Sequence, residues 1–226
     1  MSINKEQYQK ITRELNDKAI LVAVSKTKPV EDIQALYDLG HRDFGENYVQ
    51  ELVRKYEQLP KDINWHFIGH LQSNKVKYIA PFVHLIHGVD SEKLLKEINK
   101  QGAKINRTIA CLLQVHISAE ETKFGFDEPE LDDLLTKLKT NEAEFKNVSV
   151  CGLMGMASFT EDNDLIKKEF ASLKNLFDKY AQPSTVNHKL STLSMGMSAD
   201  YRFAIDAGSN MVRIGSLLFG SRINPG

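Results

Sequence analysis

Residues 19–26 read AILVAVSK, in which six consecutive apolar residues lead into Ser25 and Lys26. Continuous apolarity over this length, without alternating polar side chains, predicts a strand buried on both faces, as in a parallel sheet. The next segment, residues 29–40 (PVEDIQALYDLG), begins with a proline suited to a first helical turn and ends with a glycine suited to a helix C-terminus. This stretch therefore predicts a strand followed directly by a helix.

The same strand-and-helix unit recurs to the end of the chain. Strands that alternate with helices predict parallel pairing through right-handed crossovers. Eight such units within 226 residues predict an α/β fold, a single (β/α)8 TIM barrel that occupies residues 1–226 as one domain. The seven further predicted strands are RDFGEN (42–47), WHFIGH (65–70), HLIHGVD (84–90), RTIACLLQVHI (107–117), VSVCGLMGMA (148–157), TLSMG (192–196) and MVRIGSLLFG (211–220).

Two details complete the fold prediction. Residues 3–15 carry apolar side chains near helical spacing and predict an extra N-terminal helix before the barrel. The alternative α/β architecture is an open, doubly wound sheet, but no GxGxxG fingerprint follows any predicted strand. The closed barrel is therefore favoured.

The composition excludes several classes of protein. Lys and Arg number 29 against 30 Asp and Glu, so broad electrostatic binding to nucleic acid or to an anionic membrane is not expected. Two cysteines are too few for a disulfide framework. No apolar run approaches the roughly 20 residues that cross a bilayer, and the polar N-terminal segment lacks the apolar stretch of a secretory signal. We expect a cytoplasmic protein, and a monomer because no coiled-coil heptad is evident.

Lys26 is the sharpest candidate for chemistry, since reacting groups of such barrels gather at the C-terminal ends of the strands. Desolvation at the barrel mouth disfavours an ammonium ion, which lowers the lysine pKa and frees the amine to attack a carbonyl. Arg213 and the loop residue Lys123 would strengthen this effect if they lie close. The alternative interpretation is an ordinary solvated lysine at a strand end.

Glycines mark the ends of the last two predicted strands, in LSMGMSAD (193–200) and RIGS (213–216). Barrels frequently bind phosphate at this position through loop N–H groups and a helix N-terminus. We therefore predict an anion site there, although the glycines could instead serve only to permit tight turns. The glycines and hydroxyl residues of the two segments are Ser194, Gly196, Ser198, Gly215 and Ser216.

The histidines and cysteines do not predict a metal site. His66 and His70 are expected to face the same way along one strand. A metal ion would need further ligands, and Cys111 and Cys151 are expected within strands. We interpret His66 as structural and His70 as a hydrogen-bonding group at the edge of a pocket.

A nucleophilic lysine beside anion-binding loops is compatible with two chemistries. One is a Schiff-base aldolase that acts on a phosphorylated sugar. The other is a pyridoxal phosphate (PLP) site, in which the lysine holds the aldehyde and the loops hold the phosphate. The residues by themselves leave both open.

Six motifs occur in order between residues 22 and 220: VAVSKTKP, FGENYVQE, WHFIGHLQSNK, GLMGMA, LSMGMSAD and VRIGSLLFG. Together they resemble the pyridoxal phosphate homeostasis proteins, the YggS/PROSC family, whose fold is similar to the barrel of alanine racemase. The resemblance implies that the chain binds PLP as a lysine Schiff base and acts in intracellular PLP homeostasis as a cofactor carrier or buffer. It implies no established catalytic activity, and PLP-dependent apoenzymes are the implied partners.

The resemblance also implies residue roles. Lys26 is expected to carry PLP, Arg213 to approach the pyridine nitrogen, and the LSMGMS and RIGS segments to bind phosphate. Lys123 is expected to be a transfer lysine or a secondary lysine. Three residues at the ends of the second, third and sixth predicted strands complete the predicted cofactor-binding set: Asn47, His70 and Met154.

An arginine beside the pyridine nitrogen has a chemical consequence. It disfavours protonation of that nitrogen, because two positive charges would meet in a shielded pocket. The unprotonated ring is a weaker electron sink, so carbanion chemistry receives less assistance. The chain also ends soon after the eighth predicted strand, so we expect no second catalytic domain. A carrier is therefore favoured over the alternative, a PLP-dependent amino acid racemase-like enzyme.

Overall fold

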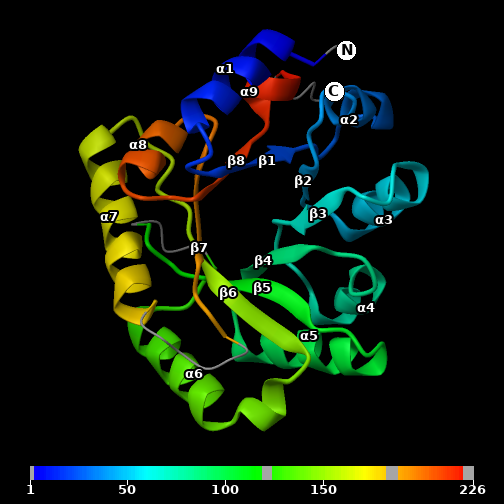
Figure 1. Cartoon of the computed structure of the whole chain (residues 1–226). Coiled ribbons are helices and arrows are strands. Elements are labelled where there is room, and N and C mark those ends of the chain that lie inside the picture. Colours follow the sequence, from blue (N-terminus) through cyan, green and yellow to red (C-terminus); the bar gives the residue numbers. More distant parts are fainter. Residues whose placement is uncertain (1–2, 119–123, 182–187, 221–226) are drawn as a thin grey trace.

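Eight parallel strands form the centre of the molecule. The structure, a computed structural model, describes residues 3–118, 124–181 and 188–220. Within these residues each strand pairs with the next and β8 pairs with β1, so the sheet closes into the predicted (β/α)8 barrel (Figure 1). The strands are β1 (Ile20–Val24), β2 (Asp43–Glu46), β3 (Asn64–Phe67), β4 (Leu85–Val89), β5 (Ile109–Gln114), β6 (Val148–Met154), β7 (Thr192–Met197) and β8 (Met211–Ile214).

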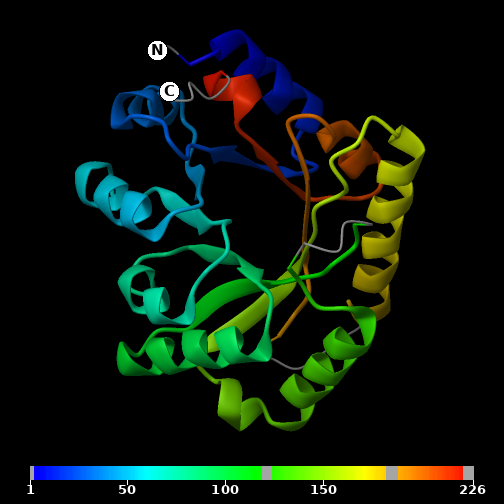
Figure 2. The same cartoon turned by 180° about the vertical axis from the view of Figure 1, so that it is seen from behind.

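Helices connect successive strands and form the outer layer. From behind, α2 to α5 cover one side of the barrel and α6 and α7 cover the other (Figure 2). The helices are α1 (Lys5–Leu15), α2 (Val30–Tyr37), α3 (Val49–Gln58), α4 (Val76–Ile79), α5 (Glu92–Lys104), α6 (Glu128–Thr140), α7 (Asn163–Tyr180), α8 (Tyr201–Asp206) and α9 (Ser216–Phe219), with 3-10 turns η1 (Ser73–Lys75) and η2 (Glu142–Phe145).

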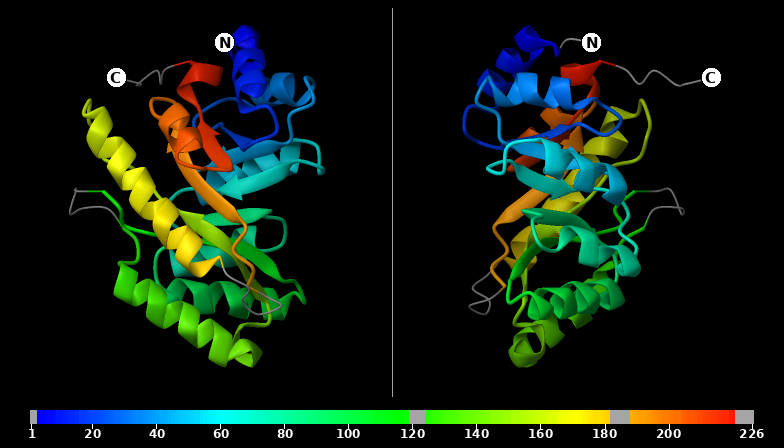
Figure 3. Two further views of the ribbon diagram at one scale, coloured as in Figure 1. Left: turned by 60° about the vertical axis from the view of Figure 1, so that its left-hand side comes forward. Right: turned by 90° about the vertical axis from the view of Figure 1, so that its right-hand side faces the viewer.

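The predicted N-terminal helix is confirmed as α1. The side chain of Asn4 caps it by accepting a hydrogen bond from the backbone N–H of Gln7 at 3.0 Å. The backbone N–H of Asn4 donates to the carbonyl of Leu218 at 2.8 Å, so α1 lies beside α9 and the described ends of the chain meet (Figure 3). α1 is therefore an addition to the barrel that packs against its last helix.

Several predicted strands extend beyond the observed ones: β5 ends at Gln114 instead of 117 and β6 at Met154 instead of 157. Two further differences change which residues share an element. The segment 211–220 is not one strand, because β8 ends at Ile214 and Ser216 begins α9. His66 and His70 do not share a strand, because β3 ends at Phe67. The chain turns at Gly69, where a Cβ atom would come 2.4 Å from the backbone oxygen of Asn47. Only glycine permits this close backbone approach, and the chain has left the strand before it reaches His70.

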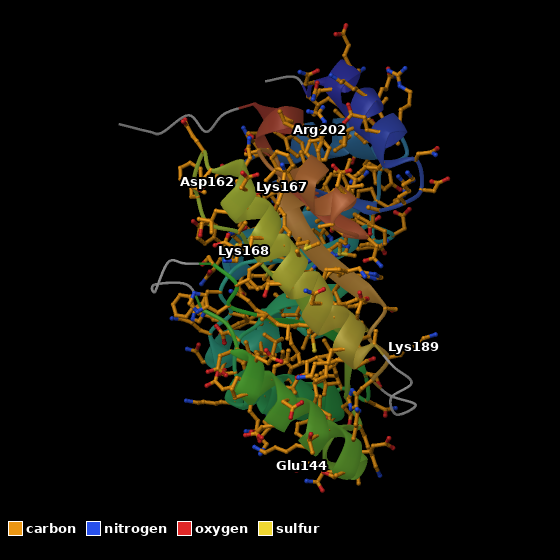
Figure 4. All side chains as sticks on the ribbon, turned by 90° about the vertical axis from the view of Figure 1, so that its left-hand side faces the viewer. Glu144, Asp162, Lys167, Lys168, Lys189 and Arg202 are labelled. Carbon is orange, nitrogen blue, oxygen red and sulfur yellow. The ribbon has the colours of Figure 1, made fainter. Side chains whose placement is uncertain are left out.

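The outer helices bury one apolar face against the sheet. In α7 the buried side includes Ile166, Phe170 and Leu173, whereas Lys167 and Lys168 are exposed on the outer surface (Figure 4). This is the pattern expected of helices that cover a barrel. No helix in the described residues has both the length and the apolarity required to cross a membrane.

The interior of the barrel is partly polar. A small apolar cluster inside it contains Val22, Leu85, Leu112, Met154 and Met211. Four buried polar side chains accompany these residues: His66, His87, Ser194 and Arg213. Burial of polar groups is costly unless they are hydrogen-bonded, so the partners of these four decide what the barrel interior can do.

Candidate functional site

A cavity of about 540 Å³ lies at the C-terminal ends of the strands. Its walls come from the segments that follow β1, β2, β3, β6, β7 and β8. A hollow of about 560 Å³ elsewhere is bounded only by residues 139–144 at the end of α6 and holds none of the predicted site residues. Six predicted residues line the barrel-mouth cavity: Lys26, Asn47, Ser198, Arg213, Gly215 and Ser216.

The backbone around Lys26 is held on both sides. The carbonyl of Ser25 accepts a hydrogen bond from Lys55 Nζ at 2.7 Å, and the N–H of Thr27 donates to Glu51 Oε1 at 2.7 Å. Thr27 has a φ of 65°, a conformation that costs a non-glycine residue about 1–3 kcal/mol and is retained where surrounding contacts enforce it. The position of the Lys26 side chain at the mouth is therefore built into the fold.

Lys55 is the centre of the buried network behind this segment. Besides Ser25, its Nζ donates to Glu46 Oε1 and Glu51 Oε1, each at 2.7 Å. The hydroxyl of Ser25 donates to Glu46 Oε1 at 2.6 Å. Burial raises the pKa of Glu46 to about 7, although the charge of Lys55 opposes this rise. The lysine segment thus rests on a buried ion pair rather than on apolar packing.

Arg213 reaches the cavity from β8 and is held rigidly. Its Nη1 donates to the carbonyl and the hydroxyl of Ser194, at 2.9 and 2.7 Å, and its Nη2 donates to the carbonyl of Gly155 at 3.0 Å. Burial lowers the pKa of Arg213 to about 10, against the influence of Asp200. The guanidinium therefore remains charged at neutral pH and forms a fixed cation in the cavity wall.

The loops after β7 and β8 lie against each other. The N–H of Gly215 donates to the hydroxyl oxygen of Ser198 at 3.2 Å, and the N–H of Met197 donates to Asp200 Oδ1 at 2.6 Å. A Cβ atom at Gly215 would press on the carbonyl oxygen of Val24 at 3.1 Å. Glycine therefore brings this loop close to β1, and the two serine residues of the loops, Ser198 and Ser216, line the same cavity.

Asn47 contributes an unused polar atom. Its side-chain oxygen Oδ1 is buried and has no hydrogen-bond partner within the described protein, and the residue lines the cavity. A buried oxygen without a partner costs about 1–3 kcal/mol. Such an atom in a cavity wall is suited to a hydrogen bond with a ligand.

Four predicted residues do not line the cavity. Met154 lies in the apolar cluster inside the barrel, and Ser194 lies behind Arg213. Gly196 adopts a φ of +94°, and a Cβ there would come 2.5 Å from Cβ of Ala204, so this glycine lets β7 pack against α8. His70 is exposed and contacts Asp90 Oδ2 at 3.0 Å.

The structure also locates the other histidines and the cysteines. His66 contacts His87 and Asp43 inside the barrel. Cys111 and Cys151 lie within β5 and β6, as expected, and neither forms a disulfide. Across residues 3–118, 124–181 and 188–220, no group of three or more His, Cys, Asp or Glu side chains is arranged to hold a metal ion. Lys123 lies outside the described residues.

Sequence reasoning missed the residues that support Lys26 from α3. Lys55 and Glu51 stand one helical turn apart in an ordinary amphipathic helix, so nothing in the local pattern distinguishes them from surface charges. Lys28, the second lysine of the SKTKP motif, also lines the cavity, and its Nζ donates to the carbonyls of Phe219 and Gly220 at 2.8 and 3.2 Å. The repeated lysine in the motif was the available signal for Lys28.

The arrangement suits a small carbonyl compound with an anionic group. The cavity is within the ordinary size range of ligand pockets, about 300–1,000 Å³. Its walls carry an amine, a fixed guanidinium, two hydroxyls and an unsatisfied amide oxygen. The amine can condense with a carbonyl, and the hydroxyls and cation can bind an anion.

The comparisons with known proteins agree with this geometry. The family model described as alanine racemase, N-terminal domain, matches residues 4–223. A pyridoxal phosphate homeostasis protein of Aquifex aeolicus is 42% identical over 205 residues, which cover 90% of this chain and 87% of that protein. This chain belongs to the pyridoxal phosphate homeostasis protein family. The Synechocystis member is 39% identical and covers 96% of this chain and 97% of its own length.

Solved structures extend the family comparison. PipY of Synechococcus elongatus, solved with PLP bound, matches with 31% identity and a TM-score of 0.84, over 95% of this chain and 99% of that one. Alanine racemase of Clostridium difficile matches with 13% identity and a TM-score of 0.76, over 99% of this chain and 59% of that one. The alanine racemase match shows the fold alone.

Proposed function

We propose that this protein binds PLP as a Schiff base on Lys26 and acts in PLP homeostasis as a carrier or buffer of the cofactor. The observation that carries the proposal is the convergence of Lys26, Arg213 and the Ser198 and Ser216 loops on one cavity. The names of the related homeostasis proteins and the PLP-bound structure of PipY support it.

The residues present fit PLP. Lys26 would hold the aldehyde, since its Nζ would condense with the aldehyde carbon and one water would be released. Arg213 would face the pyridine nitrogen, and the loop hydroxyls of Ser198 and Ser216, with the nearby Gly215, would hold the phosphate. Asn47 offers its unpartnered Oδ1 to the polar substituents of the ring.

The four predicted residues outside the cavity wall have other places in the proposal. Ser194 and Gly196 would support the site without contacting PLP, since Ser194 binds Arg213 and Gly196 shapes the β7 loop. For His70 and Met154, a direct role toward PLP remains a prediction. His70 would form part of the rim through its contact with Asp90.

The chemistry of Arg213 favours storage over catalysis. Its charge, held by Ser194 and Gly155, opposes a second positive charge on a pyridine nitrogen placed beside it. When bound, PLP supplies an electron sink, and an unprotonated ring makes that sink weaker. The proposal is therefore a protein that holds the cofactor rather than one that turns over a substrate.

Borohydride reduction tests the covalent assignment. The purified protein is mixed with PLP, reduced, digested and mapped by mass spectrometry. We expect the adduct on Lys26, its loss in Lys26→Ala, and its retention in Lys28→Ala, because Lys28 Nζ is engaged by the Phe219 and Gly220 carbonyls. An adduct that survives in Lys26→Ala and disappears in Lys28→Ala contradicts the proposal. Trapping of a phosphosugar without added PLP would favour an aldolase instead.

A racemase-like activity is the second candidate, favoured by the fold match to alanine racemases. It predicts deuterium exchange at Cα when amino acids are supplied with PLP in D₂O. The Lys26→Ala variant is the matched control, since it removes the amine from the same cavity. No exchange with any amino acid removes this candidate and leaves the carrier.

The proposal extends to the setting in which the protein acts. We propose a monomer in the cytoplasm that passes PLP to PLP-dependent apoenzymes. The near-neutral formal charge of −1 supports a small-molecule role over nucleic-acid binding. Light scattering during gel filtration measures the oligomeric state. Activation of an apoenzyme by the loaded protein, faster than by the same concentration of free PLP, is the expected sign of transfer.

A further inference from the structure

Behind the proposed ring site, four polar side chains form a connected path through the barrel interior. Ser194 Oγ, which accepts from Arg213, contacts His87 Nδ1 at 3.2 Å. His87 Nε2 contacts His66 Nδ1 at 2.9 Å, and His66 Nε2 contacts Asp43 Oδ1 at 3.0 Å. The contact between β4 and β7 crosses the barrel, since these strands are not neighbours. One path therefore links Arg213 at the cavity to Asp43 at the first residue of β2.

The two ends of this path fix its direction. A guanidinium can only donate hydrogen bonds and an ionised carboxylate can only accept them. The hydroxyl oxygen of Ser194 accepts from Arg213. Within the described residues the other contact of this hydroxyl is His87 Nδ1, so we infer that the hydroxyl proton points to His87 Nδ1. His87 must then carry its proton on Nε2 and donate to His66.

The same logic continues to the carboxylate. His66 accepts at Nδ1, so its proton is on Nε2 and is donated to Asp43. Burial holds the pKa of His87 well below its ordinary value, aided by His66 and Arg213, which agrees with a neutral ring. Burial is the largest single influence on the pKa of Asp43 and raises it, but the hydrogen bonds from His66 and Asn64 and the electrostatic influence of His66 and His41 together lower it. Each hydrogen bond of the path therefore forms with one assignment of donor and acceptor, which runs from Arg213 toward Asp43.

We propose that Ser194, His87, His66 and Asp43 are positioning residues that hold Arg213 in place for the pyridine nitrogen through a one-way hydrogen-bond chain. The chain matters because Arg213 is a fully buried cation whose side-chain partner is a rotatable hydroxyl. Fixing the hydroxyl proton toward His87 leaves the Ser194 oxygen lone pair directed at the guanidinium. This inference rests on the proposed function for its role, but the chain itself is a property of the protein without cofactor.

Histidine tautomers test the chain directly. The protein is labelled with ¹⁵N-histidine, and two-bond ¹H–¹⁵N correlation spectra are recorded at pH 7 without PLP, with His66 and His87 assigned by substitution of each. Both rings are expected to be neutral and protonated on Nε2. A proton on Nδ1 of either ring, or a doubly protonated His66, overturns the chain. The measurement needs no PLP, so its outcome is independent of the proposed function.

Variants of Asp43 test the donor and acceptor order of the chain. Asp43→Ala removes the last acceptor and should convert His66 to mixed tautomers, whereas Asp43→Asn keeps an acceptor oxygen and should restore Nε2 protonation. His84→Gln is the matched control, because the His84 ring lies 5.3 Å from His66 but takes no part in the chain. Unchanged tautomers in Asp43→Ala would overturn the chain.

The last arm measures PLP affinity. Ser194→Ala leaves the cavity wall intact and removes one hydrogen bond to a charged group, which should weaken PLP binding about tenfold. The absorption band of bound PLP should also shift, since the charge beside its ring would be less fixed. Unchanged affinity and spectrum in a folded Ser194→Ala protein would overturn the positioning role. Failure of PLP to bind the unaltered protein would instead reject the proposed function.

Discussion

The two sides of the cavity hold their polar groups by different means. On the β1–β2 side, Lys26 is carried by a segment fixed to the buried Glu46–Lys55 ion pair. On the β7–β8 side, the Ser198 and Gly215 loops are held by hydrogen bonds from backbone N–H groups to side chains and by glycines that permit close approach. Charge therefore positions the amine, whereas backbone shape positions the anion-binding loops, and the two sides should respond differently to mutation and pH.

The largest effect should come from breaking the ion pair. Lys55→Met leaves Glu46 buried without its cation, and removal of one partner from a buried pair costs about 3–5 kcal/mol. Urea denaturation measures the loss in unfolding free energy. Lys96→Met is the matched control, because its pair with Glu92 is on the surface, where such pairs contribute about 0–1 kcal/mol. Equal losses in both variants would contradict the asymmetry between the two sides.

On the β7–β8 side of the cavity, Gly196→Ala tests whether backbone shape holds the loop after β7. This substitution combines a φ of +94° with a Cβ placed 2.5 Å from Cβ of Ala204. We expect the unfolding free energy to fall by about 2–4 kcal/mol from backbone strain and overpacking together. Gly40→Ala has the same φ of +94° but nothing within 4 Å, so its loss should be about 1 kcal/mol from backbone conformation. The difference between the two alanine variants isolates the packing of β7 on α8.

The dependence of stability on pH should come from Glu46, on the β1–β2 side of the cavity. Burial raises the folded-state pKa of Glu46 to about 7 from 4.5, so the folded protein binds more protons than the unfolded chain between these values. The stability from Glu46 is then fully present below pH 4.5 and is lost as the pH rises through 7. Relative to Glu46→Gln, the unfolding free energy of the unaltered protein should fall by about 1–3 kcal/mol between pH 5 and pH 8. Parallel pH curves for the two proteins would contradict this assignment.

The smallest expected effect is at Asn47. Its Oδ1 has no partner within the described protein, so Asn47→Ala removes no hydrogen bond of that atom and should not lower the midpoint of urea unfolding. PLP affinity should fall by about three- to tenfold if a ligand hydrogen bond is lost. Equilibrium titration monitored by absorbance measures this change. A large loss of stability with unchanged affinity would mean that Asn47 serves the fold.

The sequence predicted the fold far better than the support of the site. Continuous apolar strands and capped helices are local signals, so all eight strands and the N-terminal helix were located. The ends of β3, β5, β6 and β8 were placed three or more residues too late. Lys26, Arg213 and the glycine loops follow strand ends and could be predicted from position. The Lys55 network could not, because Lys55 and Glu46 are nine residues apart and meet only when α3 packs on the barrel.

The sequence by itself determined an alternation of buried strands and amphipathic helices and placed an amine, a cation and small hydroxyl residues at strand ends, because periodicity and strand length are local properties. The closed barrel decided which of those residues share a cavity. It separated His70 from His66, gave Ser194 a place behind Arg213 and joined β4 to β7 through His87. Such contacts depend on which strands face one another across the barrel, and no local pattern in the chain encodes that.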